Sequence, residues 1–214
     1  MLRIKSLSHR YENENLVIDD LSLEVNKGEI ISILGPSGCG KTSLLRIVAG
    51  LEKPLKGEIK IDEKIVFNQT INISPEKRNL GLVVEDKALF PHLSVYKNII
   101  FGIRKNKQQK QLAEEFLNLF KIEHLKDKFP HEISSGEQQR TALARAIITN
   151  PDILLLDEPF SALDKELKNE LHEETKKIFI EKNLTVLLVT HDEGESSFFS
   201  NRVFKFKDQR LLEI

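Results

Sequence analysis

The chain has 214 residues, of which 40% are hydrophobic, so it suits one large folded domain or a domain with an inserted lobe rather than a disordered chain. Its net charge is −1, which gives no electrostatic argument for nucleic acid or an anionic membrane surface as a partner. The single cysteine, Cys39, excludes a disulfide within the chain and suits a reducing compartment.

No segment of the sequence is apolar over a length that would span a bilayer, because no run approaches about 18 apolar residues. The N-terminus also lacks the apolar core of a signal peptide. If the protein works at a membrane, we expect it to reach that membrane through another chain.

The pattern of apolar residues predicts strands that alternate with helices along the chain. Short apolar runs or alternation predict strands at residues 2–7, 16–25, 30–34, 82–84, 153–156, 185–189 and 203–206, with a hairpin at 57–67. Apolar residues at helical spacing predict helices at residues 41–49, 108–120, 136–149 and 165–182. This alternation is typical of an α/β fold with a mainly parallel sheet, whose last strand we expect at 203–206. The mostly helical residues 88–150 predict a helical subdomain inserted between the two parts of one core, 1–87 and 151–214.

Residues 35–42 match the pattern of a glycine, four residues and then Gly-Lys-Thr, between a predicted buried strand and a helix. Glycines let the backbone turn so that several N–H groups point at phosphate oxygens, and the helix adds the positive end of its dipole. In this arrangement Lys41 reaches the β- and γ-phosphates and the Thr42 hydroxyl binds Mg²⁺, so the pattern predicts MgATP as the ligand. The predicted binding residues are Gly35, Pro36, Ser37, Gly38, Cys39, Gly40, Lys41, Thr42 and Ser43.

Two adjacent carboxylates follow the apolar run 154–156, at the carboxyl end of a predicted buried strand. Ligands of open α/β sheets bind at that end, and buried carboxylates need partners. We therefore predict that Asp157 holds Mg²⁺ and that Glu158 is the general base for the water that attacks the γ-phosphate. His191 follows the strand predicted at 185–189, so we expect it in the same crevice, where it can orient the water or donate to the phosphate.

Together with residues 133–140, these motifs resemble the ATP-binding subunit of ABC transporters over almost the whole chain. Residues 35–42 resemble its Walker A loop, 153–158 its Walker B strand with the catalytic glutamate, and His191 its switch histidine. The resemblance implies a P-loop NTPase fold with a mainly parallel core sheet, an N-terminal antiparallel β subdomain and a helical signature subdomain. It also implies that Tyr11 stacks on adenine.

Residues 133–137 resemble the family signature, at the start of the helix predicted at 136–149. Taken alone, Ser134 is a helix N-cap. The resemblance implies that this helix end faces the γ-phosphate bound to a second subunit, so that two ATP molecules hold two subunits head to tail. We expect a homodimer, although the sequence leaves open a second subunit that differs from this chain. The residues implied in this contact are Ser134, Ser135, Gly136, Glu137 and, in a stretch similar to the D-loop, Asp164.

Three residues depart from the family pattern. Ser135 and Glu137 replace a glycine and a glutamine of the signature. We therefore expect the two subunits to close on ATP more weakly or differently, but still to close. Glu85 replaces a glutamine that touches Mg²⁺ and links the site to the membrane partner. A carboxylate is a good Mg²⁺ ligand, so Glu85 is still predicted to bind nucleotide and metal, although it also repels the phosphates.

The sequences of residues 88–95 and 159–164 resemble those of importer subunits that handle ferric iron, polyamines, sulfate, molybdate or sugars. Those subunits usually carry a C-terminal regulatory domain, which we expect to be absent because the chain stops soon after Phe206. The resemblance implies transmembrane permease subunits, an extracytoplasmic substrate-binding protein, and a cytoplasmic position on the inner face of the cell membrane. Phe90 and Leu93 are candidates for docking the permease, but packing inside the helical subdomain fits them equally well.

Other functions stay open from the sequence. ABC ATPases that act on DNA or ribosomes carry long coiled-coil insertions or two cassettes, and this sequence shows neither. A non-hydrolysing nucleotide-binding module is suggested by the three departures, whereas four residues argue against it: Lys41, Asp157, Glu158 and His191. A small-molecule kinase is disfavoured because the signature would have no role in it.

Overall fold

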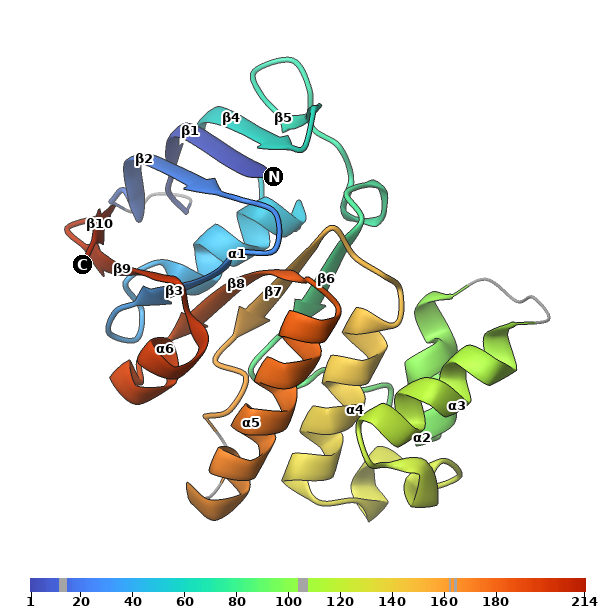
Figure 1. Cartoon of the computed structure of the whole chain (residues 1–214). Helices are drawn as coiled ribbons and strands as arrows, with labels where there is room; N and C mark the ends of the chain where they lie inside the picture. Colours follow the sequence, from blue (N-terminus) through green and yellow to red (C-terminus); the bar gives the residue numbers. More distant parts are fainter. Residues whose placement is uncertain (12–14, 104–107, 162, 164) are drawn as a thin grey trace.

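The computed structural model describes residues 1–11, 15–103, 108–161, 163 and 165–214. Its larger sheet has the strand order β10-β9-β3-β8-β7-β6, in which the pairings are parallel except that of β10 with β9 (Figure 1). The strands are β3 (Ile30–Leu34), β6 (Leu80–Val83), β7 (Ile153–Asp157), β8 (Thr185–Thr190), β9 (Arg202–Lys207) and β10 (Arg210–Glu213). The carboxyl ends of β3, β7 and β8 therefore lie side by side at one edge of the sheet.

The central strands β7 and β8 are buried on both faces, which explains why their sequences are apolar without alternation. Ile153 and Leu155 of β7 pack into one hydrophobic core, whereas Leu154 and Leu156 pack into another. Because side chains alternate along a strand, one continuous apolar run contributes to both cores.

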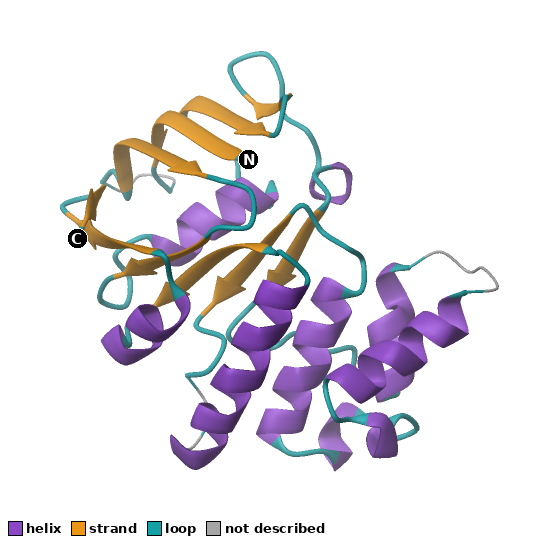
Figure 2. Cartoon of the chain, viewed as in Figure 1, coloured by secondary structure: helices purple, strands orange, loops and turns teal. Residues whose placement is uncertain are grey.

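The first core lies between the larger sheet and a smaller antiparallel sheet with the order β2-β1-β4-β5 (Figure 2). The strands of the smaller sheet are β1 (Leu2–His9), β2 (Ile18–Val25), β4 (Lys56–Ile61) and β5 (Lys64–Phe67). Helix α1 (Lys41–Ala49) lies between the two sheets and buries Leu44, Leu45, Ile47 and Val48 there. This packing fixes the start of α1, and with it the predicted phosphate loop.

The second core lies on the other face of the larger sheet, where the remaining helices pack (Figure 1). They are α2 (Val95–Ile99), α3 (Gln109–Leu119), α4 (Ser135–Ile147), α5 (Lys165–Glu181) and α6 (Glu193–Phe199). Short 3₁₀ turns lie at Pro75–Lys77, Ile100–Gly102, Glu123–Leu125 and Pro130–Glu132. In the part of the chain that the structure describes, no helix combines the length and the apolar character needed to cross a membrane.

The structure confirms the α/β class, the mainly parallel sheet and the antiparallel N-terminal sheet. The prediction that 203–206 is the last strand is wrong, because β10 turns back and pairs antiparallel with β9. This strand has four residues, mostly exposed, so it lacks the apolar pattern that marks a buried strand. The subdomain boundaries at residues 88 and 150 stay predictions.

Arg78 fixes the far end of α1 and is 3% exposed. Its guanidinium donates to the carbonyls of Ile47 and Val48 (both 2.9 Å), in the last turn of α1, and to that of Ile73 (2.8 Å). Replacing Arg78 with methionine removes its hydrogen bonds to all three carbonyls, of which that of Ile47 still accepts from the Gly50 backbone N–H. Because the other two carbonyls lose their charged donor, we expect the free energy of unfolding to fall by about 3 kcal/mol. Urea denaturation measures this change.

The control for this substitution is Arg3→Met, because Arg3 is half-exposed and pairs on the surface with Glu24. A surface ion pair contributes about 1 kcal/mol at most. If the urea midpoint of Arg78→Met were no lower than that of Arg3→Met, Arg78 would not stabilise the end of α1 in this way.

Candidate active site

The loop between β3 and α1 has the backbone of an anion site. Gly38 and Gly40 have positive φ angles of 77° and 113°, which few other residues adopt. A Cβ atom at Gly40 would lie 2.8 Å from a methyl carbon of Val17, so the position has no room for a side chain. Gly40 caps α1 without a side-chain hydrogen bond, and no acidic residue lies in the first turn. The N–H groups at this helix end are therefore available to an anionic ligand.

Lys41 places its ammonium group inside this loop and is 5% exposed. Its Nζ donates to the carbonyls of Gly35 (2.7 Å) and Pro36 (3.0 Å) and lies 3.7 Å from Oε1 of Glu158. The loop thus holds a cation directly above a helix N-terminus, a combination that suits phosphate oxygens.

The end of β7 brings carboxylates to the same loop. The Thr42 hydroxyl donates to Oδ1 of Asp157 at 3.0 Å. Burial raises the pKa of the Asp157 carboxyl; the Thr42 hydrogen bond lowers it, and the negative charges of Glu158 and Glu85 raise it further. A divalent cation between these groups would relieve both the burial of charge and the repulsion, so the residues present fit Mg²⁺.

The number of protein ligands also fits Mg²⁺ rather than a metal held by the protein alone. Among the described residues, no group of three or more His, Cys, Asp or Glu side chains is arranged to hold a metal. Mg²⁺ usually takes one or two protein ligands and completes its shell with water and substrate phosphates. Thr42 with Glu85 or Asp157 provides such a set.

Glu158 and His191 meet because β7 and β8 are neighbours. Nδ1 of His191 lies 2.8 Å from Oε2 of Glu158, and the Glu158 backbone N–H donates to the carbonyl of Val189. Glu158 has a φ of 47°, a conformation that costs energy for a residue with a side chain and that often occurs at functional sites. Its carboxylate is 12% exposed, while the His191 side chain is 59% exposed and reaches solvent.

The residue after His191 fixes the turn that carries it. Asp192 is the N-cap of α6: its Oδ1 accepts from the Glu195 backbone N–H at 3.0 Å, and its Oδ2 accepts from Lys168 of α5 at 2.6 Å. The hydrogen bond from Lys168, followed by that from Glu195, lowers the pKa of Asp192 to about 2. The carboxylate is therefore ionised and holds this turn throughout the neutral range.

The phosphate loop and Glu158 line one cavity of about 350 Å³, and Asp157 and His191 adjoin it through their contacts with Thr42 and Glu158. Its lining residues are Tyr11, Val17, Ser37, Gly38, Gly40, Lys41, Thr42, Ser43, Glu85 and Glu158. The predicted phosphate loop, metal site and general base therefore converge, and Tyr11 and Glu85 reach the same space. Gly35 and Pro36 take part through their carbonyls on Lys41, and the Cys39 side chain packs beside Gly35. Asp164 lies outside the described residues.

The residues of the signature stretch lie elsewhere, at the start of α4. Ser134 is the N-cap, as predicted: its hydroxyl accepts from the Glu137 backbone N–H, and Glu137 accepts in return from the Ser134 N–H at 2.7 Å. Burial opposes the charge of Glu137, but the Ser134 hydrogen bonds outweigh it and lower the pKa of this carboxyl. Glu137 thus carries a negative charge at the helix end where we expect a phosphate. The Ser-x-x-Glu spacing alone predicts this capping box.

The sequence did not indicate Lys87, which links the loop after β6 to α4. Its Nζ donates to the Ser135 hydroxyl at 3.0 Å, and Arg145 of α4 donates to the carbonyls of Lys87 (3.0 Å) and Ala88 (2.8 Å). Lys87 and Ala88 have positive φ angles of 62° and 42°, which these contacts maintain. No local sequence pattern predicts this contact, because its partners are 48 or more residues away.

Phe90 and Leu93 are both half-buried, so the two interpretations of them stay open. The buried side chain of Asn98 bonds the backbone N–H and carbonyl of Phe90, and the Phe90 ring contacts Phe101 with a centroid distance of 4.2 Å. Phe101, which we did not predict, is the most exposed apolar side chain of this group.

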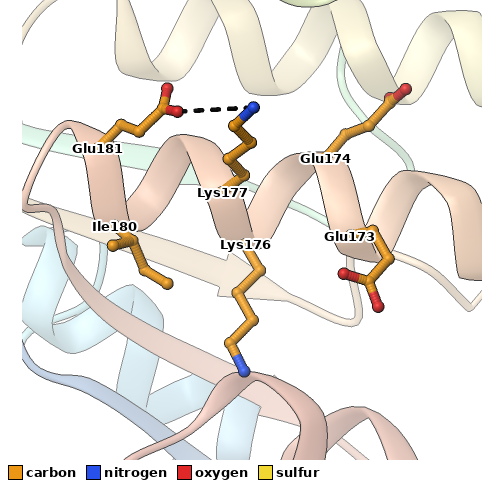
Figure 3. A pocket seen from close by; sticks show the side chains of 6 residues that line it. All are labelled: Glu173, Glu174, Lys176, Lys177, Ile180 and Glu181. Atoms are coloured by element: carbon orange, nitrogen blue, oxygen red, sulfur yellow. Dashed lines mark ion pairs between the residues drawn. The ribbon is translucent and has the colours of Figure 1, made fainter.

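A second hollow lies on the outer face of α5 and contains no predicted site residue (Figure 3). It measures about 570 Å³ and is lined by Glu173, Glu174, Lys176, Lys177, Ile180 and Glu181. Lys177 pairs with Glu181 one turn away at 3.8 Å, as is common on a solvated helix face. Size alone therefore does not identify the site, and the chemistry of the residues that line the hollow does.

Replacing Glu85 with glutamine should raise the Mg²⁺ concentration needed for half-maximal ATPase activity about two- to fivefold, since Glu85 is exposed and its charge is screened by solvent. A Mg²⁺ titration of the ATPase rate at saturating ATP measures this shift. Asp86→Asn is the matched control, because Asp86 is the neighbouring exposed carboxylate and does not line the cavity. Superimposable titrations of wild type and Glu85→Gln would rule out a metal-binding role for Glu85.

Residues 18–161 match a family model described as ABC transporter. The Fe(3+) ions import ATP-binding protein FbpC 2 of Haemophilus influenzae is 41% identical, and the match covers 100% of this chain and 61% of that protein. The spermidine/putrescine import ATP-binding protein PotA of Bacillus thuringiensis is also 41% identical, and that match covers 100% of this chain and 65% of PotA. The chain thus spans less than two thirds of the length of these curated relatives.

Two solved structures match nearly the whole chain. The dimeric ATP-binding cassette MJ0796, in a post-hydrolysis state bound to ADP and Pi, has a TM-score of 0.86 and 30% identity, covering 100% of this chain and 98% of that chain. The protein cbiO1 from Clostridium perfringens, part of the ABC transporter complex cbiONQ, has a TM-score of 0.86 and 28% identity. That match covers 99% of this chain and 86% of cbiO1. These matches confirm the resemblance drawn from the motifs: the chain belongs to the ABC transporter family and corresponds to its ATP-binding cassette.

Proposed function

We propose that the chain binds and hydrolyses MgATP and thereby powers an ABC transporter, as its ATP-binding subunit. The observation that carries this proposal is the convergence of Lys41, Thr42, Asp157, Glu158 and His191, which come from three separate segments, on one edge of the sheet. A chance phosphate loop would have no reason to bring a paired carboxylate and histidine to the same place.

Each of these residues has a definite task in the proposed reaction. The loop N–H groups and Lys41 bind the phosphates, and Thr42, Glu85 and Asp157 hold Mg²⁺. The metal supplies charge neutralisation at the phosphate oxygens. Glu158 accepts a proton from the attacking water, and His191 holds the Glu158 carboxylate in position from the solvent side.

We also propose that the active unit is a homodimer arranged head to tail. In it the start of α4, with Ser134, Ser135, Gly136 and Glu137, and the segment with Asp164 would face the nucleotide of the partner subunit. The support is the dimeric form of the solved cassette MJ0796 and the helix N-terminus that α4 presents. The carboxylate of Glu137 at this end is the reason to expect weaker closure.

The partners proposed for this dimer are transmembrane permease subunits and an extracytoplasmic substrate-binding protein, with the dimer on the inner, cytoplasmic face of the cell membrane. The relatives at 41% identity are named for import of ferric ions and of polyamines. The proposed cargo is therefore a small solute or ion taken up by the cell.

The test of the enzymatic part is a steady-state assay of phosphate release by the purified chain. We expect release that saturates with ATP and requires Mg²⁺. If the chain bound MgATP but released no phosphate, alone or with its permease, the alternative of a non-hydrolysing nucleotide-binding module would replace the proposal. Co-purification with nucleic acid instead of membrane subunits would contradict the transport role.

A further inference from the structure

Glu52 lies just beyond the C-terminal end of α1 and contacts Tyr11, which lines the cavity, as well as Arg46 of α1. Its Oε2 accepts a hydrogen bond from the Tyr11 hydroxyl at 3.0 Å, and its Oε1 pairs with Nε of Arg46 at 2.5 Å. The backbone N–H of Glu52 donates to the carbonyl of Arg46, which holds the residue against the helix end. The Glu52 side chain is 15% exposed, so its carboxylate is directed into the structure rather than into solvent.

The hydrogen bonds at Tyr11 have a direction that the chemistry of the groups decides. A carboxylate only accepts, so the Tyr11 hydroxyl must donate its one hydrogen to Glu52. The Tyr11 oxygen, 2.8 Å from Oγ of Ser43, must then accept from the Ser43 hydroxyl. The resulting chain runs from Ser43, in the first turn of α1, through Tyr11 to Glu52.

The Tyr11 ring is also held from the side. His9, the last residue of β1, is buried and packs edge to face against it, with ring centroids 5.0 Å apart at 83°. Nε2 of His9 lies 3.5 Å from the same oxygen of Glu52. Burial raises the pKa of Tyr11, the Ser43 hydrogen bond lowers it and the Glu52 carboxylate raises it, so the hydroxyl keeps its proton at neutral pH.

We propose that Glu52 is a positioning residue for the nucleobase, which acts by tethering the Tyr11 ring at the mouth of the cavity at a fixed distance from the phosphate loop. This inference rests on the proposed function and concerns the part of the site that the phosphate-loop motif does not describe. Tyr11 and Ser43 both line the cavity, so the tether joins the surface offered to the base with the helix that begins at the phosphates. A ring that is already fixed loses less side-chain entropy when a base stacks on it.

The hydrogen bond between Tyr11 and Glu52, here called the tether, leads to a prediction that stacking of Tyr11 on the base does not make by itself. Tyr11→Phe keeps the aromatic ring and removes the hydroxyl, while Glu52→Ala keeps Tyr11 and removes its acceptor. We expect each to raise the Kd for MgATP about three- to tenfold, in line with the net contribution of one ordinary hydrogen bond. The double variant should be no weaker than either single variant, because both remove the same contact.

Tripolyphosphate separates a role in base binding from support of the phosphate loop. It carries the phosphates of ATP but no base, so its Mg²⁺ complex should bind wild type, Tyr11→Phe and Glu52→Ala with the same Kd, measured by calorimetry. Glu52→Gln keeps an oxygen that can accept from Tyr11 and should restore most of the affinity for MgATP. Glu63→Ala is the control, because Glu63 is an exposed acidic residue of the β4–β5 turn that pairs with Lys60 on the surface.

The possible results separate this inference from the function on which it rests. MgATP binding by Tyr11→Phe equal to that of wild type would overturn the tether. A loss of tripolyphosphate binding equal to the loss of MgATP binding in Glu52→Ala would also overturn it, because the contacts would then support the phosphate loop through Ser43. If wild type bound neither MgATP nor the tripolyphosphate complex, the proposed function itself would fail.

Discussion

Replacing Glu158 with glutamine is expected to lower the rate of ATP hydrolysis by about 10²–10⁴-fold, while MgATP still binds. Glutamine has nearly the same shape but cannot take a proton from the attacking water. The contacts around position 158 argue for this role, because His191 and Lys41 hold the carboxylate at the edge of the cavity and its backbone is strained. Phosphate release under saturating MgATP measures the rate, and calorimetry measures the binding.

The control for this variant is Glu173→Gln, an exposed residue on the outer face of α5 that is far from the phosphate loop in sequence and lines a different hollow. It should hydrolyse ATP as wild type does. A Glu158→Gln protein with the wild-type rate would show that another group accepts the proton and would remove Glu158 from the proposed mechanism.

Lys41→Met is expected to weaken MgATP binding by about 30-fold or more, since the loss of a buried charged partner costs about 2–5 kcal/mol. Two effects act in the same direction. The phosphates lose a cation that is already placed above the helix N-terminus, and the Glu158 carboxylate, 3.7 Å from Nζ, loses its counter-charge and repels the anion. Displacement of a fluorescent ATP analogue gives the two affinities.

Lys53→Met serves as the matched variant, because Lys53 is exposed in the turn after α1 and does not line the cavity. Thermal unfolding of both variants shows whether the fold is retained. Equal affinities for Lys41→Met and Lys53→Met would mean that the loop does not bind the phosphates through its lysine.

The sequence was sufficient for the parts of the site that depend on neighbouring residues or on one general rule of topology. The phosphate loop is a continuous motif, so its position between a strand and a helix could be predicted directly. That Glu158 and His191 face the same crevice was predicted from the rule that ligands bind at the carboxyl ends of parallel strands. The structure adds that β7 and β8 are direct neighbours, which places the two side chains 2.8 Å apart.

The remaining features depend on contacts between distant segments, which no local pattern encodes. Tyr11 and Glu52 are 41 residues apart, and Lys87 and Ser135 are 48 apart. Short elements were missed for a related reason. Helices α2 and α6 have five and seven residues, too few to show a helical period, and they form because they pack against the second core.

The central claim is that the loop at residues 35–42 holds the triphosphate of MgATP. Isothermal titration of the intact, nucleotide-free chain with MgATP tests it most directly. Saturable heat corresponding to one nucleotide per chain is the predicted result. A flat titration with a correctly folded chain would contradict the claim, and with it the assignment of every residue around the cavity.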